Sequence, residues 1–549
     1  MTSSKFPIKK LIFKEITRNN FQMKPLLFVL SLFLYIAPSL HGQMTARPNI
    51  LFIAVDDLKP IMGCYGNKGI KTPNIDRLAK MGTTFMNNHC QQAVCGPTRA
   101  SLLTGKRPDA TKVWDLRTQM RDMNPNILTL PQYFTQNNYQ TVGIGKLFHP
   151  SSAIDKVDPI SWSIPYLNPS PEDYANNLGE PTNGQYQDPF IKKTFVKERK
   201  PRTGPIDEDI PTSIKGPSSE CIDVPDHAYD DGVYALKAKA QMIKMSKEKA
   251  PFLMAVGFQK PHLPFVAPKK YWDLYDRESM PLASFQEHAK NSPLIAYHKS
   301  GELLNYPDIP ASVTLSGDSL RIGLKVAKQK ELIHGYYAAV SYLDAQVGIL
   351  LNTLDSLGIT NNTIVVLWGD HGWHLGDHDL WVKHSTYEQA TRSPLIISAP
   401  GIKAGKSSSP TEHVDIFPTL CQLAGLPVPK DLDGVSLTPV MRNNKLSVKE
   451  FAMSQYPRRL KNEEAKKLGY TNPQLMGYSL RTDKYRYTLW MNHFTSKSPF
   501  DAKKVYAAEL YDYTKDPLEK INVANEPEYS KISSSLNEKM IQFFKSQLN

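Results

Sequence analysis

The chain has 549 residues, of which 41% are hydrophobic, and its 66 Lys and Arg against 53 Asp and Glu give a formal net charge of +13. This composition is ordinary for a folded protein and excludes disorder, while the length allows a large core and a second domain. Because the basic residues are spread over the whole sequence, we expect no nucleic-acid partner.

Residues 1–43 are predicted to form a signal peptide. Six basic residues and one acidic residue precede an apolar run at 26–37, which is the order typical of a secretory signal. The run is too short to span a bilayer comfortably, so we expect no stable membrane insertion, although retention as an N-terminal anchor stays open. The sequence therefore predicts an exported protein, periplasmic or secreted, and its Lys- and Asn-rich composition favours a bacterial source.

Four apolar runs of strand length end directly in residues that bind metals or transfer protons. The runs and the residues that follow them are 49–55 with Asp56 and Asp57, 141–144 with Lys146 and His149, 252–256 with Lys260 and His262, and 363–368 with Asp370 and His371. Ligand sites of open parallel sheets lie at the carboxyl ends of their strands. We therefore expect these side chains to converge in one crevice.

Residues 95–105 place a cysteine at the first turn of a predicted short helix. Pro97 suits the first helical position, and Gly105 suits the helix exit. The helix dipole there favours chemistry with anions, and a buried, unreactive Cys95 is the alternative. The chain has five cysteines: Cys64, Cys90, Cys95, Cys221 and Cys421. Their odd number leaves at least one thiol free or modified.

Helical patterns at 74–81, 130–137, 231–247 and 330–357 lie between the predicted strands. This alternation predicts the α/β class, with a large, mostly parallel sheet flanked by helices. Two stretches, 150–225 and 281–322, are predicted to be insertions at the sheet edge or over the pocket mouth. Short strand-like segments after residue 451 and a helix at 530–547 predict an α+β subdomain, which divides the mature chain into 44–445 and 446–549.

The strand-end residues Asp56, Asp57, Asp370 and His371 predict a cation site. This oxygen-rich set suits Ca²⁺ or Mg²⁺ better than zinc, although the histidine keeps a transition metal open. Helix capping or a salt bridge is the alternative for each pair taken singly. Lys146, His149, His262 and Lys383 are then the available cationic donors and proton carriers. A reaction that builds an oxyanion and expels an alkoxide needs this mixture.

Several of these motifs resemble those of the type I sulfatases. They are Cys95-x-Pro97-x-Arg99, Asp56-Asp57, Gly145-Lys146-x-x-His149, Lys260-Pro261-His262 and Asp370-His371-Gly372. Residues 92–95, 145–150, 341–344, 370–373, 454–458 and 476–482 are most similar to the iduronate-2-sulfatase branch of that family. The resemblance extends over about residues 47–520, and it implies an alkaline-phosphatase-like α/β core with a C-terminal antiparallel sheet.

The resemblance also implies roles for individual residues. Five of them would bind one Ca²⁺: Asp56, Asp57, Asp370, His371 and Cys95, the last oxidised to formylglycine. The formylglycine hydrate would attack sulfur while Arg99 and Lys146 hold its charge. His262 and Lys383 would bind the sulfate and assist departure of the sugar hydroxyl, with Trp373 in the substrate pocket. His149 would take the proton that regenerates the aldehyde.

The implied function is hydrolysis of an O-sulfate ester on a carbohydrate. The substrate class would be a uronate-containing sulfated polysaccharide of the ulvan or glycosaminoglycan type, and the chain would need a formylglycine-generating enzyme as its maturation partner. The neighbours of Trp373 and Lys383 depart from the branch pattern, which leaves the sugar open. The alternatives are a phosphoester or phosphonate hydrolase of the same superfamily and a non-catalytic glycan-binding protein.

Overall fold

The computed structural model describes residues 47–175, 178–182, 185–195, 216–309, 314–316, 319–467, 469, 473–493 and 500–547. The predicted signal peptide, residues 1–43, lies outside these ranges. Within them, we find no helix with the length and apolar character that crossing a membrane requires.

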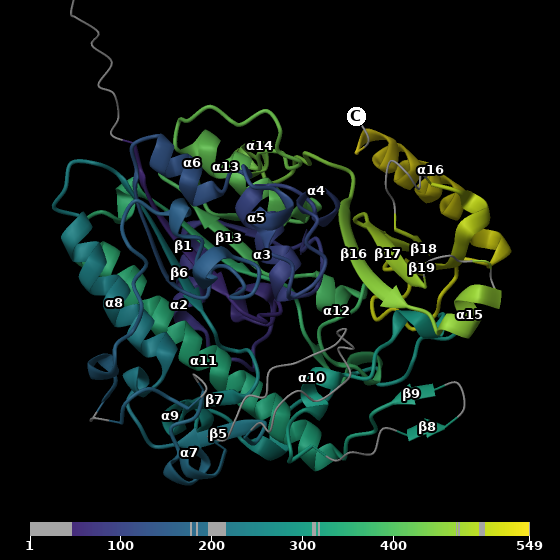
Figure 1. Ribbon diagram of the computed structural model, residues 1–549, viewed down its shortest axis with the longest axis horizontal. Coiled ribbons are helices and arrows are strands. Elements are labelled where there is room, and N and C mark those ends of the chain that lie inside the picture. The colour runs from purple at the N-terminus through teal and green to yellow at the C-terminus, as the bar shows by residue number, and fades with distance from the viewer. Residues whose placement is uncertain are drawn as a thin grey trace, which may run out of the picture. The chain divides into compact units, whose positions relative to one another are not determined.

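A seven-stranded sheet forms the centre of residues 47–549 (Figure 1). Its strands, in spatial order, are β14 (Gly405–Ser407), β2 (Thr83–Phe85), β13 (Leu395–Ser398), β10 (Thr363–Gly369), β1 (Asn49–Val55), β6 (Phe252–Phe258) and β4 (Gln140–Gly145). The strands β10, β1, β6 and β4 run parallel, and β13 runs antiparallel to both of its neighbours. The four predicted apolar runs are these four parallel strands, which read as continuous apolar segments because both faces of the sheet are covered.

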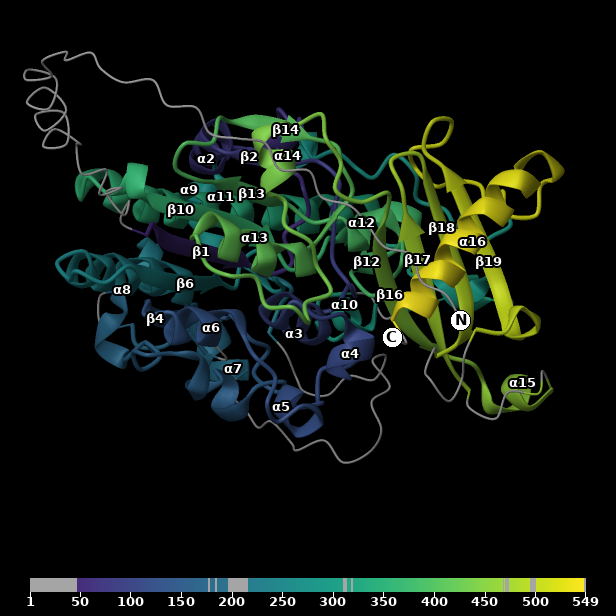
Figure 2. The same ribbon diagram turned by 90° about the horizontal axis from the view of Figure 1, so that it is seen from above.

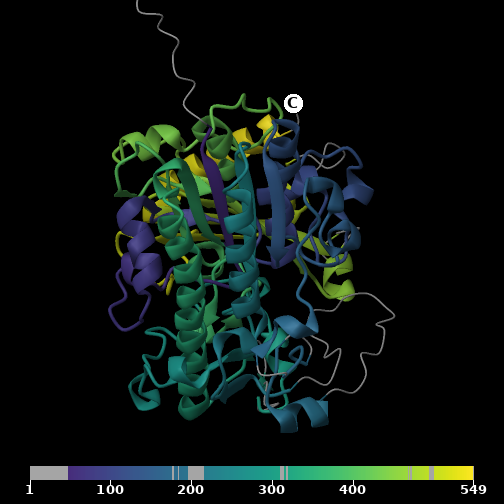
Figure 3. The same ribbon diagram turned by 90° about the vertical axis from the view of Figure 1, so that its left-hand side faces the viewer.

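Helices cover both faces of the sheet. On one face, α8 (Asp230–Met245) and α11 (Val326–Ser356) lie side by side (Figure 3), and they share a core with α2 (Pro73–Met81) and with Leu51 and Ile53 of β1. On the other face, α3 (Cys95–Thr104), α6 (Leu130–Gln136) and α13 (Ile416–Leu423) share a core with Phe52 and Ala54. Successive residues of β1 thus point to opposite faces, as the pleat requires. The predicted α/β class is confirmed.

The described parts of the two predicted insertions consist of short elements and loops. In chain order they include α7 (Pro189–Phe195), β5 (Ser219–Ile222), α10 (Gly301–Leu304), β8 (Thr314–Ser316) and β9 (Ser319–Arg321). The strand β5 pairs with β7 (Phe265–Pro268), which α9 (Lys269–Trp272) follows directly. Further short elements are β3 (Asn88–His89), α4 (Pro108–Thr111), α5 (Met120–Met123), β11 (His374–Leu375), β12 (Trp381–Val382), α12 (Glu388–Thr391), β15 (Thr411–Glu412) and α14 (Thr438–Arg442).

A second, four-stranded antiparallel sheet forms the C-terminal part (Figure 2). Its strands are β16 (Ala452–Arg459), β17 (Gln474–Arg481), β18 (Tyr485–Asn492) and β19 (Val505–Asp512), with α15 (Asn462–Lys467) following β16. The last helix, α16 (Ser530–Ser546), buries Leu536, Met540 and Phe544 in the core of this sheet. The antiparallel C-terminal sheet is therefore confirmed. Residues 47–549 form one compact unit, and the boundary at 445/446 stays a prediction.

Candidate active site

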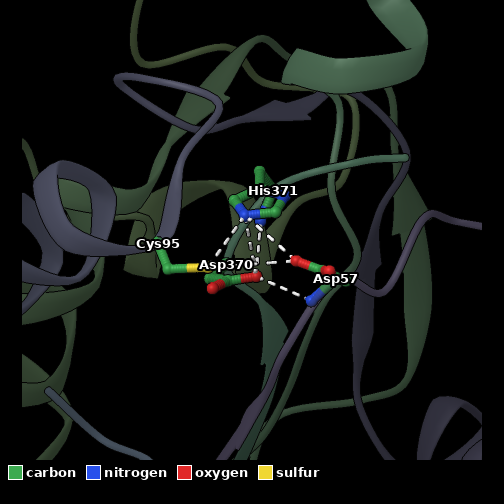
Figure 4. A group of neighbouring side chains, drawn as sticks. All are labelled: Asp57, Cys95, Asp370 and His371. Carbon is green, nitrogen blue, oxygen red and sulfur yellow. Dashed lines mark hydrogen bonds and ion pairs between the residues drawn. The ribbon is translucent and has the colours of Figure 1, made fainter. Parts of the chain in front are cut away.

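The carboxyl ends of β1 and β10 and the first turn of α3 meet in one buried cluster. Cys95 Sγ lies 3.4 Å from Asp56 Oδ1 and 3.4 Å from His371 Nε2. Asp370 Oδ1 accepts a hydrogen bond from the Asp57 amide at 2.9 Å. Figure 4 shows the side chains of Asp57, Cys95, Asp370 and His371 pointing toward one another. Residues more than 270 positions apart along the chain are therefore brought together as the strand-end pattern predicts.

The helix α3 presents Cys95 as its first residue. The prediction for Pro97 was wrong in register, because this proline is the third helical residue, where a missing N–H still costs no intrahelical bond. Gly105 ends the helix with a φ of 66°, as predicted. Burial and the Asp56 carboxylate raise the pKa of the Cys95 thiol well above its ordinary value, so the helix dipole does not produce a thiolate. All five cysteines are described, and each has a free thiol.

Four buried side chains fit a divalent cation. They are Asp57, Cys95, Asp370 and His371, whose potential ligand atoms all lie within 4.8 Å of one another. Since a carbonyl only accepts hydrogen bonds, His371 Nδ1 donates to Gly372 O at 2.9 Å, and the lone pair of Nε2 faces the cluster. This Nε2 lies 3.3 Å from Asp57 Oδ1 and 3.6 Å from Asp370 Oδ1. Two of the four potential ligands are carboxylates, which suit Ca²⁺ or Mg²⁺, and a formylglycine at position 95 would add a further oxygen.

The neighbouring carboxylates Asp56 and Asp57 differ in their electrostatics. Burial opposes ionisation of Asp56, yet Lys146 and Arg99 hold its pKa well below the ordinary value. Burial raises the pKa of Asp57 to about 7, with Lys383 opposing this shift and the Asp56 charge adding to it. Asp56, Asp57 and His262 also form a second group with metal-ligand spacing. A bound cation would relieve the cost of ionising Asp57.

Arg99 donates hydrogen bonds to residues that follow three of the parallel strands, β1, β10 and β4. Its Nε donates to Asp370 Oδ2 at 2.9 Å, and its NH2 donates to Asp56 Oδ1 at 3.0 Å. Its NH1 donates to the main-chain carbonyls of Lys146 and Leu147. Lys146 Nζ donates to Asp56 Oδ2 at 2.5 Å and keeps 17% of its side chain exposed. Lys146 is therefore partly exposed to solvent, whereas Arg99 is fully buried.

The other predicted site residues lie around this centre. Lys383 Nζ donates to both oxygens of Asp57 at 3.0 Å, and it lies 5.0 Å from the ring centroid of the buried Trp373. His262 Nε2 lies 3.7 Å from Asp57 Oδ2. His149 contacts the Ser151 hydroxyl through Nδ1 at 2.8 Å. Burial, with Lys146 adding, lowers the pKa of His149 to about 3, so its ring is neutral near pH 7.

Sequence reasoning missed one residue of this site, Glu302. Its Oε1 lies 3.1 Å from His262 Nε2, and its Oε2 lies 3.1 Å from Lys383 Nζ and 3.2 Å from His384 Nε2. Glu302 belongs to the short helix α10, inside the stretch predicted to be an insertion. Because no strand ends beside it, the strand-end pattern does not point to this residue.

Comparison with known proteins places this geometry in a family. Residues 48–426 match the Sulfatase family, and residues 376–546 match the family described as N-sulphoglucosamine sulphohydrolase, C-terminal. Human iduronate 2-sulfatase is 35% identical over 536 residues, which cover 88% of this chain and 92% of the human protein. The ulvan-active sulfatase of Formosa agariphila is 26% identical over 504 residues, which cover 90% of this chain and 80% of that protein.

Among solved structures, the phosphonate monoester hydrolase of Agrobacterium radiobacter matches with a TM-score of 0.65. The match covers 91% of this chain and 96% of that one at 22% identity, which shows a common fold alone. The predicted alkaline-phosphatase-like fold and the predicted likeness to iduronate-2-sulfatase are confirmed. The chain belongs to the sulfatase family, and it is a sulfuric ester hydrolase.

Proposed function

We propose that this enzyme hydrolyses an O-sulfate ester on a uronate-containing carbohydrate, using formylglycine at position 95 and one Ca²⁺. The observation that carries the proposal is the approach of Cys95 Sγ, Asp57, Asp370 and His371 to within 4.8 Å of one another. Two relatives support the substrate class by their names, one for iduronate and one for ulvan. A glycan polymer of the ulvan or glycosaminoglycan type, or its oligosaccharides, fits both names.

Formylglycine at position 95 would supply the nucleophile, and Ca²⁺ would supply additional positive charge. When formed, the hydrate of formylglycine provides an oxygen nucleophile, and Ca²⁺ neutralises charge on the sulfate. Asp57, Asp370 and His371, together with Asp56 and residue 95, would hold the cation. The unmodified Cys95 is a poor nucleophile because burial keeps its thiol protonated.

Residues of the chain would bind the sulfate and transfer the protons. Lys146, which donates a hydrogen bond to Asp56 beside Cys95, would stabilise negative charge on residue 95. Arg99 would hold the carboxylates of Asp56 and Asp370 in place. Lys383 and His262 would bind sulfate oxygens, and His262 would give a proton to the departing sugar oxygen. His149 would take the proton that regenerates the aldehyde; its ring is neutral, and burial makes it a weak base.

We also propose roles for Trp373 and for the predicted signal peptide. Trp373 would line the sugar subsite from below, where its buried ring supports the Lys383 ammonium. The predicted signal peptide at 1–43 supports export to the periplasm or the medium of a bacterium that degrades sulfated polysaccharides. Maturation would require a formylglycine-generating enzyme or its equivalent as a partner.

Paired substrates test the proposal. An aryl sulfate and an aryl phosphate with the same phenol should differ in kcat/KM in favour of the sulfate, and sulfated uronate oligosaccharides should release sulfate faster than uronate-free ones. A preference for phosphate would favour the phosphoester or phosphonate hydrolase instead. Binding of the oligosaccharides without sulfate release, in the wild type as in Cys95→Ala, would favour the glycan-binding protein.

A further inference from the structure

We propose that Glu302 is a positioning residue that orients His262 and Lys383 toward the scissile ester. This inference rests on the proposed function, in which these two side chains act on the leaving oxygen and the sulfate. The Glu302 carboxylate contacts three side chains from two other parts of the chain: His262 after β6, and Lys383 and His384 after β12. One anion therefore connects the two segments that carry His262 and Lys383.

His262 and Glu302 are partly exposed to solvent, whereas Lys383 is buried. The cluster around Cys95 is almost completely buried, but the His262 side chain keeps 23% of its surface exposed and the Glu302 side chain keeps 17%. His262 Nδ1 lies 2.6 Å from the Leu263 carbonyl, which fixes one side of the ring. Because a carbonyl only accepts, Nδ1 donates to Leu263, and in the protonated ring the proton on Nε2 is the one that Glu302 holds at 3.1 Å and that His262 would give to the leaving oxygen once the ester is bound. The ring orientation therefore depends on this carboxylate.

The backbone holds Glu302 itself in place. The helix α10 follows Ser300, whose φ is 51° and whose Oγ accepts a hydrogen bond from the Trp381 amide at 3.0 Å. Trp381 is two residues before Lys383, so the segment carrying the carboxylate and the segment carrying the ammonium are also joined through this hydrogen bond from a main-chain amide to a serine hydroxyl. Glu302 is thus a pre-organised partner for Lys383.

Lys383 needs such a partner because the main chain around it is strained. Val382 and His384 have φ values of 72° and 62°. This left-handed conformation is unfavourable for most residues and especially for a β-branched valine. Side-chain contacts must offset that cost, and those of Lys383 go to Asp57 on one side and Glu302 on the other. Asp57 belongs to the candidate cation site, whereas Glu302 is outside that group and stays available to Lys383.

The consequence for catalysis is a dependence on the leaving group. A sugar alkoxide is a far poorer leaving group than a phenolate, whose conjugate acid has a pKa of about 10, so sugar sulfates need the proton from His262 much more than aryl sulfates do. If Glu302 orients His262, its loss should slow hydrolysis of the sugar sulfate selectively. A general loss of structure would slow both reactions alike.

The test compares Glu302→Gln and Glu302→Asp with the wild type on a sulfated uronate oligosaccharide and on 4-nitrophenyl sulfate. For Glu302→Gln we expect kcat on the sugar sulfate to fall about 30-fold or more, and the aryl sulfate rate to fall by a smaller factor of about threefold, which reports the loss of Lys383 orientation that both substrates share. Glu302→Asp, which keeps the charge, should recover part of the loss. The matched control is Glu278→Gln, since Glu278 pairs with Lys330 at the surface of the preceding segment.

The outcomes separate this inference from the proposed function. Equal losses on the two substrates, or no loss on either, would overturn the positioning role while leaving the sulfatase assignment intact. A wild-type enzyme that releases sulfate from neither substrate would overturn the proposed function and this inference with it. If Glu302→Gln fails to fold, the two rates are taken from Glu302→Asp, whose loss should be smaller but still larger on the sugar sulfate than on the aryl sulfate.

Discussion

Carboxylates are buried both in the active-site cluster and in ion pairs at the C-terminal sheet, but their pKa values are shifted in opposite directions in these two regions. In the second region, which we call the C-terminal ion-pair network, Arg481 pairs with Glu388 at 2.9 Å and Arg486 pairs with Glu519 at 2.5 Å. Although burial opposes ionisation of Glu388, Arg481 lowers its pKa below the ordinary value. In the active site, burial raises the pKa of Asp57 to about 7. Arg481 thus keeps Glu388 ionised, whereas Asp57, although paired with Lys383, lies beside the Asp56 charge and has a raised pKa that a bound cation would relieve.

The two regions are neighbours along the chain and in space. Arg486 NH1 donates to the Thr386 carbonyl at 2.8 Å, and the Glu388 amide donates to Glu519 Oε2 at 3.1 Å. This segment directly follows Lys383. The C-terminal ion-pair network therefore holds the main chain that carries a predicted catalytic side chain, which gives the second sheet a role in the site.

The largest effect is expected from breaking the network. Arg486→Met removes the partner of a buried carboxylate, so the free energy of unfolding should fall by about 3–5 kcal/mol. Urea unfolding of both proteins measures this change. The double variant Arg486→Met/Glu519→Gln should recover part of the loss. A fall below about 1 kcal/mol would show that the network does not stabilise the fold.

A charge removed from the active site should instead cost activity. Asp57→Asn should lower kcat/KM for aryl sulfate at least 100-fold, about 3 kcal/mol of transition-state stabilisation, because the cation loses a ligand. The stability of the chelator-treated protein should change much less than in Arg486→Met, since burial disfavours the Asp57 charge and Glu302 stays as a partner of Lys383. Loss of stability comparable to that of Arg486→Met would contradict the contrast between the two regions.

Calcium should stabilise the enzyme only through the active site. At a Ca²⁺ concentration 100 times Kd, mass action adds about 2.7 kcal/mol to the free energy of unfolding, seen as a higher Tm. Chelation should reverse this shift in the wild type, and Asp57→Asn should show much less of it. An equal shift in both proteins would place the bound calcium elsewhere.

The smallest expected effect is that the stability contributions of Asp57 and Glu388 change with pH in opposite directions. Metal-free Asp57 keeps its proton up to about pH 7 when folded but only to about 3.8 when unfolded, so its contribution to stability falls as the pH rises between those values. Glu388 has a lowered pKa, so its contribution is present above about pH 4.5 and is lost as the pH falls. Tm differences of about 2 °C or more between the wild type and Asp57→Asn or Glu388→Gln should follow these slopes. Slopes of the same sign would refute the comparison.

The predictable parts of the fold were those with a local pattern. The strands β1, β4, β6 and β10 are apolar runs bounded by polar residues, and their bounds agree with the prediction within two residues. The strands β2, β13 and β14 have only three or four residues each and pair with distant partners. Their place in the sheet depends on tertiary contacts, which a single sequence does not display.

The residues of the active site also differ in whether a local sequence pattern predicts them. Asp56, Asp57, Asp370 and His371 follow strands directly, so the parallel sheet alone brings them together. Glu302 comes from a four-residue helix in an insertion, and its contact with Lys383 depends on tertiary packing, which includes the hydrogen bond between Trp381 and Ser300. The neutral thiol of Cys95 was also not predictable, because it results from burial beside Asp56 rather than from the helix dipole.

The mass of the peptide containing residue 95, taken from enzyme that is turning over sulfate, tests the central claim most directly. Conversion of the cysteine to formylglycine replaces the thiol group with an aldehyde and lowers the peptide mass by about 18 Da. We predict this lower mass in active enzyme and its absence, together with all turnover, in Cys95→Ala. An unmodified thiol in fully active protein would contradict the account.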